Sequence, residues 1–261
     1  MRRLIMIGLC VAVLAGCAGP PQPGEEQALV DRSTLAVQEM LGGGNDALNA
    51  VALLRRARAV LICPRLFRAG FFFGGQGGGC VLAARDAAGS WSSPAFYTLG
   101  SGSFGLQAGI EDAELMLLIM NDRALNAILD SQFKFGADAS LAVATIGGSV
   151  GGATTAAVGA DIVTFARSRG LYAGITLQGS LLSARSDWTR SYYGQEVGPR
   201  DIVVAMRVYN PGADPLRAVL MRFGGAPGAQ LAPAPAAAVP APAPAPAPSG
   251  PVQRAPLPPL R

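Results

Sequence analysis

Glycine and aromatic residues are set into a strand-like apolar pattern through 61–109, and no other feature constrains the fold as strongly. The segment reads LICPRLFRAGFFFGGQGGGCVLAARDAAGSWSSPAFYTLGSGSFGLQAG. Glycine weakens an ordinary strand, so this density is expected where strands bend sharply, bulge, or let another backbone or a ligand approach closely. The segment therefore predicts curved antiparallel β structure with an unusual surface, and it is the best sequence guide to function.

Two helices are expected ahead of this segment. Apolar residues recur at helical spacing in 25–41, where two leading glutamates suit the positive end of a helix and a glycine triplet ends it. A second helix is expected to begin at Asn45 or Asp46 and to run to about Ala57. From Ala59 the apolar period shifts toward two, which indicates strands.

The remaining pattern predicts a mixed α+β fold. A helix is expected at 122–129, a helical turn at 188–193 and a last helix at 215–222. Strands are expected at 60–63, 70–75, 80–85, 95–99, 105–110, 114–120, 137–146, 161–167, 171–184 and 200–208. We therefore expect N-terminal helices packed on a strongly curved antiparallel sheet that is closed or partly barrel-like.

The first residues, MRRLIMIGLCVAVLAG, have the pattern of a secretory signal, with two arginines, an apolar stretch and small residues. The motif LAGC at 14–17 resembles the lipobox of bacterial lipoproteins. That resemblance implies cleavage after Gly16 and acylation of Cys17, and an ordinary cleaved signal with an incidental cysteine is the alternative. Ala18 resembles the sorting pattern of outer-membrane lipoproteins, so we expect a lipid-anchored protein of the cell envelope that faces the periplasm.

Four segments are expected along the chain. A lipoprotein signal peptide occupies 1–16, a short tether 17–24, the folded domain 25–224 and a tail 225–261. Ala-Pro repeats dominate the tail, and such a composition cannot bury a core, so the tail is expected to be disordered.

The composition excludes several classes of protein. Histidine is absent, which rules out a Ser-His-Asp or Cys-His enzyme in this chain and removes the commonest metal ligand. Removing Arg2 and Arg3 with the signal takes 21 basic residues to 19, against 17 acidic ones. The resulting charge of +2 argues against a nucleic-acid binder, which would carry a clustered basic face.

Glu111, Asp112 and Glu114 form an acidic group that could serve acid–base chemistry or bind Ca²⁺. Their spacing lacks a calcium-loop pattern, so a turn with solvated charges is favoured. The serines lack the G-x-S-x-G pattern, and the glycine-rich run lacks the G-K-[ST] of a phosphate loop. No cofactor and no metal are therefore expected.

Two cysteines, Cys63 and Cys80, remain after the expected removal of the signal and the expected acylation of Cys17. The periplasm permits a disulfide, which would close a short loop and add about 3 kcal/mol of stability. Sequence alone does not show whether the two side chains face each other, and a pair of buried free thiols is favoured.

Several separated blocks, in order, resemble the SYLF domain: GFFFGGQGGGCVLAAR, WSSPAF, GSFGLQAGIED with ELMLLIM, and GLYAGITLQGSLLSARSD before Tyr193-Gly194. The resemblance covers roughly 28–194. Departures are Cys80, where the family tends to have glycine, Phe165, where tyrosine is common, and AVATIGG at 142–148, which lacks a Gly-Pro. The resemblance implies lipid binding. Eukaryotic members bind phosphoinositides and some bundle actin, whereas bacterial members are often secreted or lipid-anchored.

Arginines close to aromatic residues are the candidate lipid contacts, because this combination suits the headgroup boundary of a bilayer. They are Arg55, Arg56, Arg58, Arg65, Arg68, Phe71, Phe72, Arg167 and Arg169. The alternative for the phenylalanines is packing in a core. For the first three arginines the alternative is a favourable interaction with the C-terminal end of a helix.

The resulting hypothesis is a non-catalytic, lipid-anchored envelope protein that binds anionic phospholipid through a SYLF-like domain. Its expected partner is the phospholipid membrane, with an envelope protein as a further candidate. Nucleic acid and actin are not expected as partners. Two alternatives stay open: an envelope scaffold that docks protein partners, and a carboxylate-dependent hydrolase.

Overall fold

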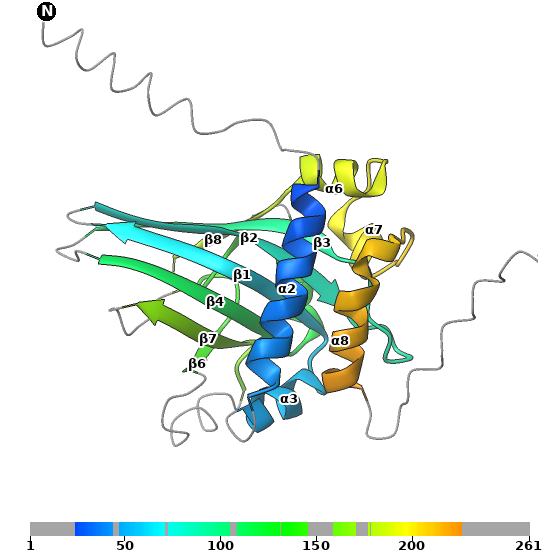
Figure 1. Cartoon of the computed structure of the whole chain (residues 1–261), viewed down its shortest axis with the longest axis horizontal. Coiled ribbons are helices and arrows are strands. Elements are labelled where there is room, and N and C mark those ends of the chain that lie inside the picture. Colours follow the sequence, from blue (N-terminus) through cyan, green and yellow to red (C-terminus); the bar gives the residue numbers. More distant parts are fainter. Residues whose placement is uncertain are drawn as a thin grey trace, which may run out of the picture. The chain divides into compact units, whose positions relative to one another are not determined.

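The computed structural model describes residues 24–43, 47–70, 73–104, 109–130, 132–145, 159–170, 177 and 179–225. Within them, one eight-stranded sheet has the order β5-β8-β3-β2-β1-β4-β7-β6 (Figure 1). The strands are β1 (Ala59–Gly70), β2 (Phe73–Ala84), β3 (Ala95–Phe104), β4 (Gly109–Ile119), β5 (Gln132–Lys134), β6 (Leu141–Thr145), β7 (Ile162–Gly170) and β8 (Leu181–Ala184). The helices are α2 (Glu25–Leu41), α3 (Leu48–Leu54), α4 (Asp122–Leu129), α6 (Ser186–Tyr193), α7 (Pro199–Val203), the 3-10 turn η3 (Pro211–Ala213) and α8 (Asp214–Gly224).

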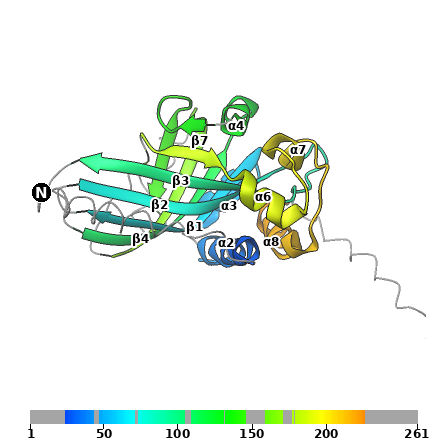
Figure 2. The same cartoon turned by 90° about the horizontal axis from the view of Figure 1, so that it is seen from above.

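The sheet curls into a half-barrel (Figure 2). Its strand pairs are antiparallel, except that β6 and β7 run parallel. The predicted class, helices packed on a strongly curved antiparallel sheet, is thus confirmed with one parallel pair as the departure. The stretch between Thr145 and Ile162 is long enough for the crossover that a parallel pair requires.

Side-chain alternation along the strands builds a core on each face of the sheet. On the inner face of the half-barrel, Leu61 and Cys63 of β1 belong to a cluster that includes residues of α4 and α7. On the outer face, Val60 and Ile62 belong to a cluster with residues of α2, α6 and α8. The helices therefore lie on two opposite sides of the sheet (Figure 2).

Helix α2 lies across the strands of the outer face, with α8 beside it (Figure 1). It buries apolar side chains such as Leu29, Val30 and Val37. Gly79 of β2 permits the close approach, because a Cβ there would lie 3.2 Å from Leu29 Cδ2. In the part of the chain that the structure describes, none of the helices is both long enough and apolar enough to cross a membrane.

The strands of the glycine-rich segment are longer than expected. Separate strands at 60–63 and 70–75 were predicted, but β1 runs from Ala59 to Gly70 without a break, and β2 runs through the whole glycine run. The reason is that the glycines pair across the sheet instead of forming turns, as Gly75 does with Gly102. The register of β1 shifts between Cys63 and Leu66, so the sequence Pro64–Arg65 forms a β-bulge.

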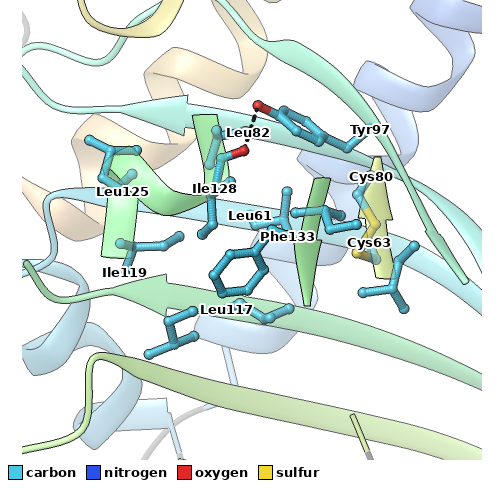
Figure 3. Packing of buried hydrophobic residues seen from close by; sticks show 14 of the residues in the cluster. Leu61, Cys63, Cys80, Leu82, Tyr97, Leu117, Ile119, Leu125, Ile128 and Phe133 are labelled. Carbon is cyan, nitrogen blue, oxygen red and sulfur yellow. Dashed lines mark hydrogen bonds between the residues drawn. A yellow bond between two sulfur atoms is a disulfide. The ribbon is translucent and has the colours of Figure 1, made fainter. Parts of the chain in front are cut away.

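Cys63 and Cys80 form a disulfide that joins β1 to β2, so the favoured free-thiol interpretation is wrong. Ile62 pairs with Val81, so the next position along each strand places Cys63 opposite Cys80. Both side chains are buried in the inner cluster (Figure 3). Tyr97 lies in the same cluster, where its hydroxyl donates to the carbonyl of Ile128 at 3.4 Å. Burial raises the pKa of Tyr97 above its ordinary value.

The prediction of a strand at 200–208 is wrong, because helix α7 covers the first residues of this segment. Pro199 occupies the first turn, where a missing N–H costs nothing, and Ile202 and Val203 are buried one after the other instead of alternating. The helices at 25–41 and 122–129 are confirmed at their predicted bounds. The three-residue strand β5 was not predicted.

Candidate functional site

One end of the sheet extends past helix α2 (Figure 1). Four of the seven predicted contact residues that the structure describes lie at this end. We call this end, formed by 65–70 of β1, 73–79 of β2, 100–104 of β3, 109–114 of β4 and 167–170 of β7, the overhang. Arg65, Arg68 and Arg167 are part of it, and Arg169 pairs there with Asp112 through its backbone. Phe71 and Phe72 fall outside the described residues.

The other three arginines lie at the opposite end of β1. The Arg58 backbone N–H donates to the carbonyl of Ile119, and its Nε pairs with Asp122 Oδ1 at 2.8 Å. Hydrogen bonding to Asp122 raises the pKa of Arg58. Arg55 donates to the Phe223 carbonyl at 3.4 Å, and Arg56 is exposed. Since Arg58 and Arg65 are seven positions apart along the strand, at about 3.3 Å each, the two groups are separated by roughly 20 Å or more and do not form one cluster.

The bulge in β1 decides which side chains of the overhang share a face. Beyond it, Leu66 belongs to the inner core, so Arg68 lies on the inner face, opposite Glu111 of β4. Arg65 and Phe67 lie on the outer face, beside α2. Arg65 and Arg68 therefore point to opposite sides of the sheet and cannot contact one flat surface together.

A groove runs between α2 and the overhang on the outer face. It consists of two hollows that share Arg32, Pro64 and Arg65 in their linings. The first hollow measures about 460 Å³ and is lined by Leu29, Arg32, Pro64, Arg65, Phe67, Gly77, Gly78, Gly79, Arg185 and Trp188. The second measures about 280 Å³ and is lined by Arg32, Leu35, Ala36, Glu39, Pro64, Arg65, Asp112, Ala113, Glu114 and Arg167.

The two hollows differ in charge. The second contains Arg167, which pairs with Glu39 at 2.9 Å and lies 4.0 Å from Glu114. The first is lined by three arginines and by no carboxylate. Arg65 uses Nε to bind Asp112 at 2.7 Å, and Arg185 binds Asp187 at 3.0 Å while its guanidinium lies 4.0 Å from the centre of the Trp188 ring. The first hollow therefore presents the more positive surface.

Large apolar side chains are exposed along the same face. Phe67 on β1 is 44% exposed, Leu35 on α2 57%, and Ile110 on β4 71%. Ile110 and Phe67 lie on one face, because Ile110 pairs with Ala69 and Asp112 pairs with Phe67. Exposed apolar groups next to arginines are typical of a surface that contacts an amphipathic partner.

The predicted acidic group is divided by the sheet. Glu111 points to the inner face and is buried, whereas Asp112 and Glu114 lie on the outer face near Arg65 and Arg167. Each of the outer carboxylates lies within ion-pair distance of an arginine, which favours the solvated-charge interpretation. Among the described residues, no three Asp, Glu, Cys or His side chains gather as a metal site.

Sequence reasoning missed Arg32, Arg185, Trp188 and Ile110 as parts of this surface. Arg185 and Trp188 come from α6 and the residue before it, more than a hundred positions after the bulge, so no local pattern connects them. Arg32 and Leu35 were visible only as one side of an amphipathic helix.

The fold and this face together define a half-barrel that carries an open groove lined by arginines and apolar side chains. Residues 100–223 match the family described as Ysc84, "Las17-binding protein actin regulator". Similar proteins include SH3 domain-containing YSC84-like protein 1 of Bos taurus, 29% identical over 181 residues (69% of this chain and 53% of the relative). Protein YSC84 of Saccharomyces cerevisiae is 28% identical over 199 residues, covering 75% of this chain and 42% of the relative. The resemblance to the SYLF-domain family is thereby confirmed.

The comparisons also correct one expectation. The matching family is described as an actin regulator, and LAS seventeen-binding protein 3 of Saccharomyces cerevisiae is 28% identical over 68% of this chain and 39% of its own length. The expectation that actin is no partner is therefore wrong. That expectation came only from the inferred periplasmic location, and none of the residues of the domain supported it. The chain spans about half the length, or less, of these relatives, whose names describe binding and regulatory proteins.

Proposed function

We propose that this protein is a non-catalytic module that binds anionic phospholipid surfaces through the outer face of the overhang. The observation that carries the proposal is the exposure of Phe67, Leu35 and Ile110 on one face that also presents Arg32 and Arg65. Apolar side chains of this kind enter the headgroup boundary, and guanidinium groups bind lipid phosphates. Among the arginines first predicted, Arg65 and Arg167 belong to this face, whereas Arg55, Arg56 and Arg58 do not.

The proposal includes attachment to the cell envelope through acyl chains on Cys17, supported by the lipobox-like motif at 14–17. With more than one chain, attachment is durable at about 0.8 kcal/mol per buried CH₂. Attachment raises the local lipid concentration, so the domain itself needs only weak headgroup affinity.

Vesicle co-sedimentation tests the proposal, using residues 17–261 with Cys17→Ser, the expected processed chain without acyl groups. At low salt the protein should sediment with vesicles containing phosphatidylglycerol and stay in solution with pure phosphatidylcholine. The double variant Phe67→Ser, Ile110→Ser should lose most of this binding. The matched control is Arg55→Gln, Arg56→Gln, which should bind as the unaltered domain does. Equal binding to both vesicle types would contradict the proposal.

A second candidate is binding of a protein partner of the actin-regulating class. It is supported by the match of residues 100–223 to a family described by that activity. Co-sedimentation of the same chain with filamentous actin tests it, since a bound domain moves from the supernatant to the pellet. Retention in the supernatant at every actin concentration would leave the phospholipid proposal as the only one.

A further inference from the structure

The first hollow has the properties of a site for one ligand molecule. Its volume of about 460 Å³ falls in the usual range of small-molecule sites, about 300–1,000 Å³. Leu29, Phe67 and Trp188 supply apolar lining, and three arginines supply charge. This combination suits a ligand that is both anionic and apolar.

The guanidinium groups of these arginines have further N–H donors that could bind such a ligand. An arginine carries five N–H donors, and among the described residues Arg65 and Arg185 each use only some of theirs on a carboxylate. Arg32 is exposed on α2 and makes no ion pair within the described ranges. Paired N–H donors of this kind match the geometry of a phosphate.

Trp188 adds an independent observation. Its side chain is buried, with 7% of the residue exposed, and its Nε1 donor has no acceptor in the part of the chain that the structure describes. Buried donors of this kind are rare in folded proteins and call for an explanation. Because this nitrogen is shielded from solvent, Trp188 contributes its ring to the lining, and the Arg185 guanidinium lies 4.0 Å from the centre of that ring.

Gly77, Gly78 and Gly79 form the remaining wall of the hollow. Close packing explains why two of these positions, but not the third, lack a side chain. A Cβ on Gly78 would lie 2.2 Å from the Arg65 carbonyl oxygen, and one on Gly79 would lie 3.2 Å from Leu29. A Cβ on Gly77 would meet only the Leu99 carbonyl oxygen, at 3.6 Å, which is an ordinary contact. Packing therefore tolerates a side chain at Gly77, and its absence keeps the hollow open.

We propose that this hollow binds a single anionic phospholipid molecule, with the phosphate held by Arg32, Arg65 and Arg185 and the apolar part against Leu29, Phe67 and Trp188. The inference rests on the proposed function but goes beyond surface contact, because it requires a discrete site that a monomeric lipid saturates. A lipid is chosen over a free phosphate ester because the lining combines the three guanidinium groups with apolar side chains.

Isothermal titration calorimetry tests the site with residues 17–261 carrying Cys17→Ser. The probe is dihexanoyl phosphatidic acid, kept below its critical micelle concentration, which should bind saturably with one molecule per chain. Dihexanoyl phosphatidylcholine and glycerol 3-phosphate should each bind at least about tenfold more weakly. Equal affinity for phosphatidylcholine, or for glycerol 3-phosphate, would overturn the assignment to an anionic lipid.

Three variants locate the site. Gly77→Leu should abolish binding by filling the hollow, Arg32→Gln should weaken it about tenfold, and Trp188→Phe about fivefold. The controls are Gly102→Leu, on the same face of the neighbouring strand with open space around it, and Arg56→Gln at the far end of β1. If Gly77→Leu fails to fold, the affinities of Arg32→Gln and Trp188→Phe decide whether the hollow is the binding site. Unchanged affinity in these variants would overturn the inference.

The vesicle experiment separates this inference from the proposed function. If anionic vesicles bind while monomeric phosphatidic acid does not, surface binding stands and the discrete site is wrong. If neither binds, both proposals fail.

Discussion

Arg85, directly after β2, donates from Nη2 to the carbonyl oxygen of Gly224, the last residue of α8, at 2.6 Å. The same guanidinium donates to the carbonyls of Leu54 and Arg55 at the end of α3, at 3.1 and 2.7 Å. The last carbonyls of a helix lack partners within the helix and carry partial negative charge. One side chain therefore closes two helix C-termini and joins them to the sheet, although burial lowers the pKa of Arg85.

Replacing this arginine should cost stability. Arg85→Met keeps much of the side-chain length but removes the donor to the Arg55 and Gly224 carbonyls and one of the two donors to the Leu54 carbonyl, so the free energy of unfolding should fall by about 2 kcal/mol. Urea denaturation followed by circular dichroism measures the change. Arg56→Met, an exposed arginine on the adjoining turn, is the control and should unfold as the unaltered protein does. Equal midpoints for both variants would show that the carbonyls find water instead.

The disulfide should contribute stability of similar size. Cys63 and Cys80 are 17 positions apart, and closing a loop of this length in the unfolded chain is worth about 3 kcal/mol. The double variant Cys63→Ala, Cys80→Ala should lower the urea midpoint accordingly. The unaltered protein should lose a comparable amount in excess reductant, whereas the double variant should not respond to reductant. A reductant effect on the double variant would contradict this assignment.

The sequence predicted the helices and the curved sheet because their signals are local, such as the spacing of apolar residues in 25–41 and 122–129. The long strands were not predicted, because glycine indicates a turn equally well when it pairs inside a strand, as Gly75 and Gly102 do. The faces of the overhang were not predictable either. A bulge at Pro64–Arg65 exchanges inward and outward positions in β1, and a one-residue shift reverses every later side chain.

The groove was harder to predict than the fold, because its lining comes from elements far apart in sequence. The basic and aromatic pattern drew attention to Arg65 and its neighbours. It could not separate them from Arg55, Arg56 and Arg58, which are close in sequence but lie at the other end of a 12-residue strand. It also gave no reason to connect Arg185 and Trp188 with Gly77.

Asp161, just before β7, should make stability depend on acidic pH. Its carboxylate accepts from the Ser140 hydroxyl at 2.7 Å, the Ser140 backbone N–H at 2.9 Å and Asn121 Nδ2 at 2.7 Å. These hydrogen bonds, the Ser140 hydroxyl first, lower the pKa of Asp161 from 3.8 to about 2. Because the folded-state pKa lies below the unfolded one, the stabilisation is complete above about pH 4 and is lost as pH falls toward 2.

Asp161→Asn removes this ionisable group with little change in shape. At pH 7 the variant should be less stable by about 1 kcal/mol, a modest value because the carboxylate is partly solvated. The difference should narrow between pH 4 and pH 2, as measured by urea denaturation at a series of pH values. The control is Asp130→Asn, an exposed carboxylate at the end of α4. A difference that stays constant across this range would show that the charge of Asp161 plays no part.

Gly78 and Gly75 provide a matched pair on β2 that tests how the bulge fixes the groove. A methyl group at Gly78 would lie 2.2 Å from the Arg65 carbonyl oxygen, so the bulge must shift, whereas one at Gly75 would lie 3.7 Å from the Ser101 carbonyl oxygen. Gly78→Ala should therefore lower the free energy of unfolding by about 2 kcal/mol, and Gly75→Ala should change it by less than about 0.5 kcal/mol. Urea denaturation of both variants measures the difference. Equal stability of the two would show that β1 and β2 separate easily at the bulge and that the backbone contact there does not hold Arg65 in place.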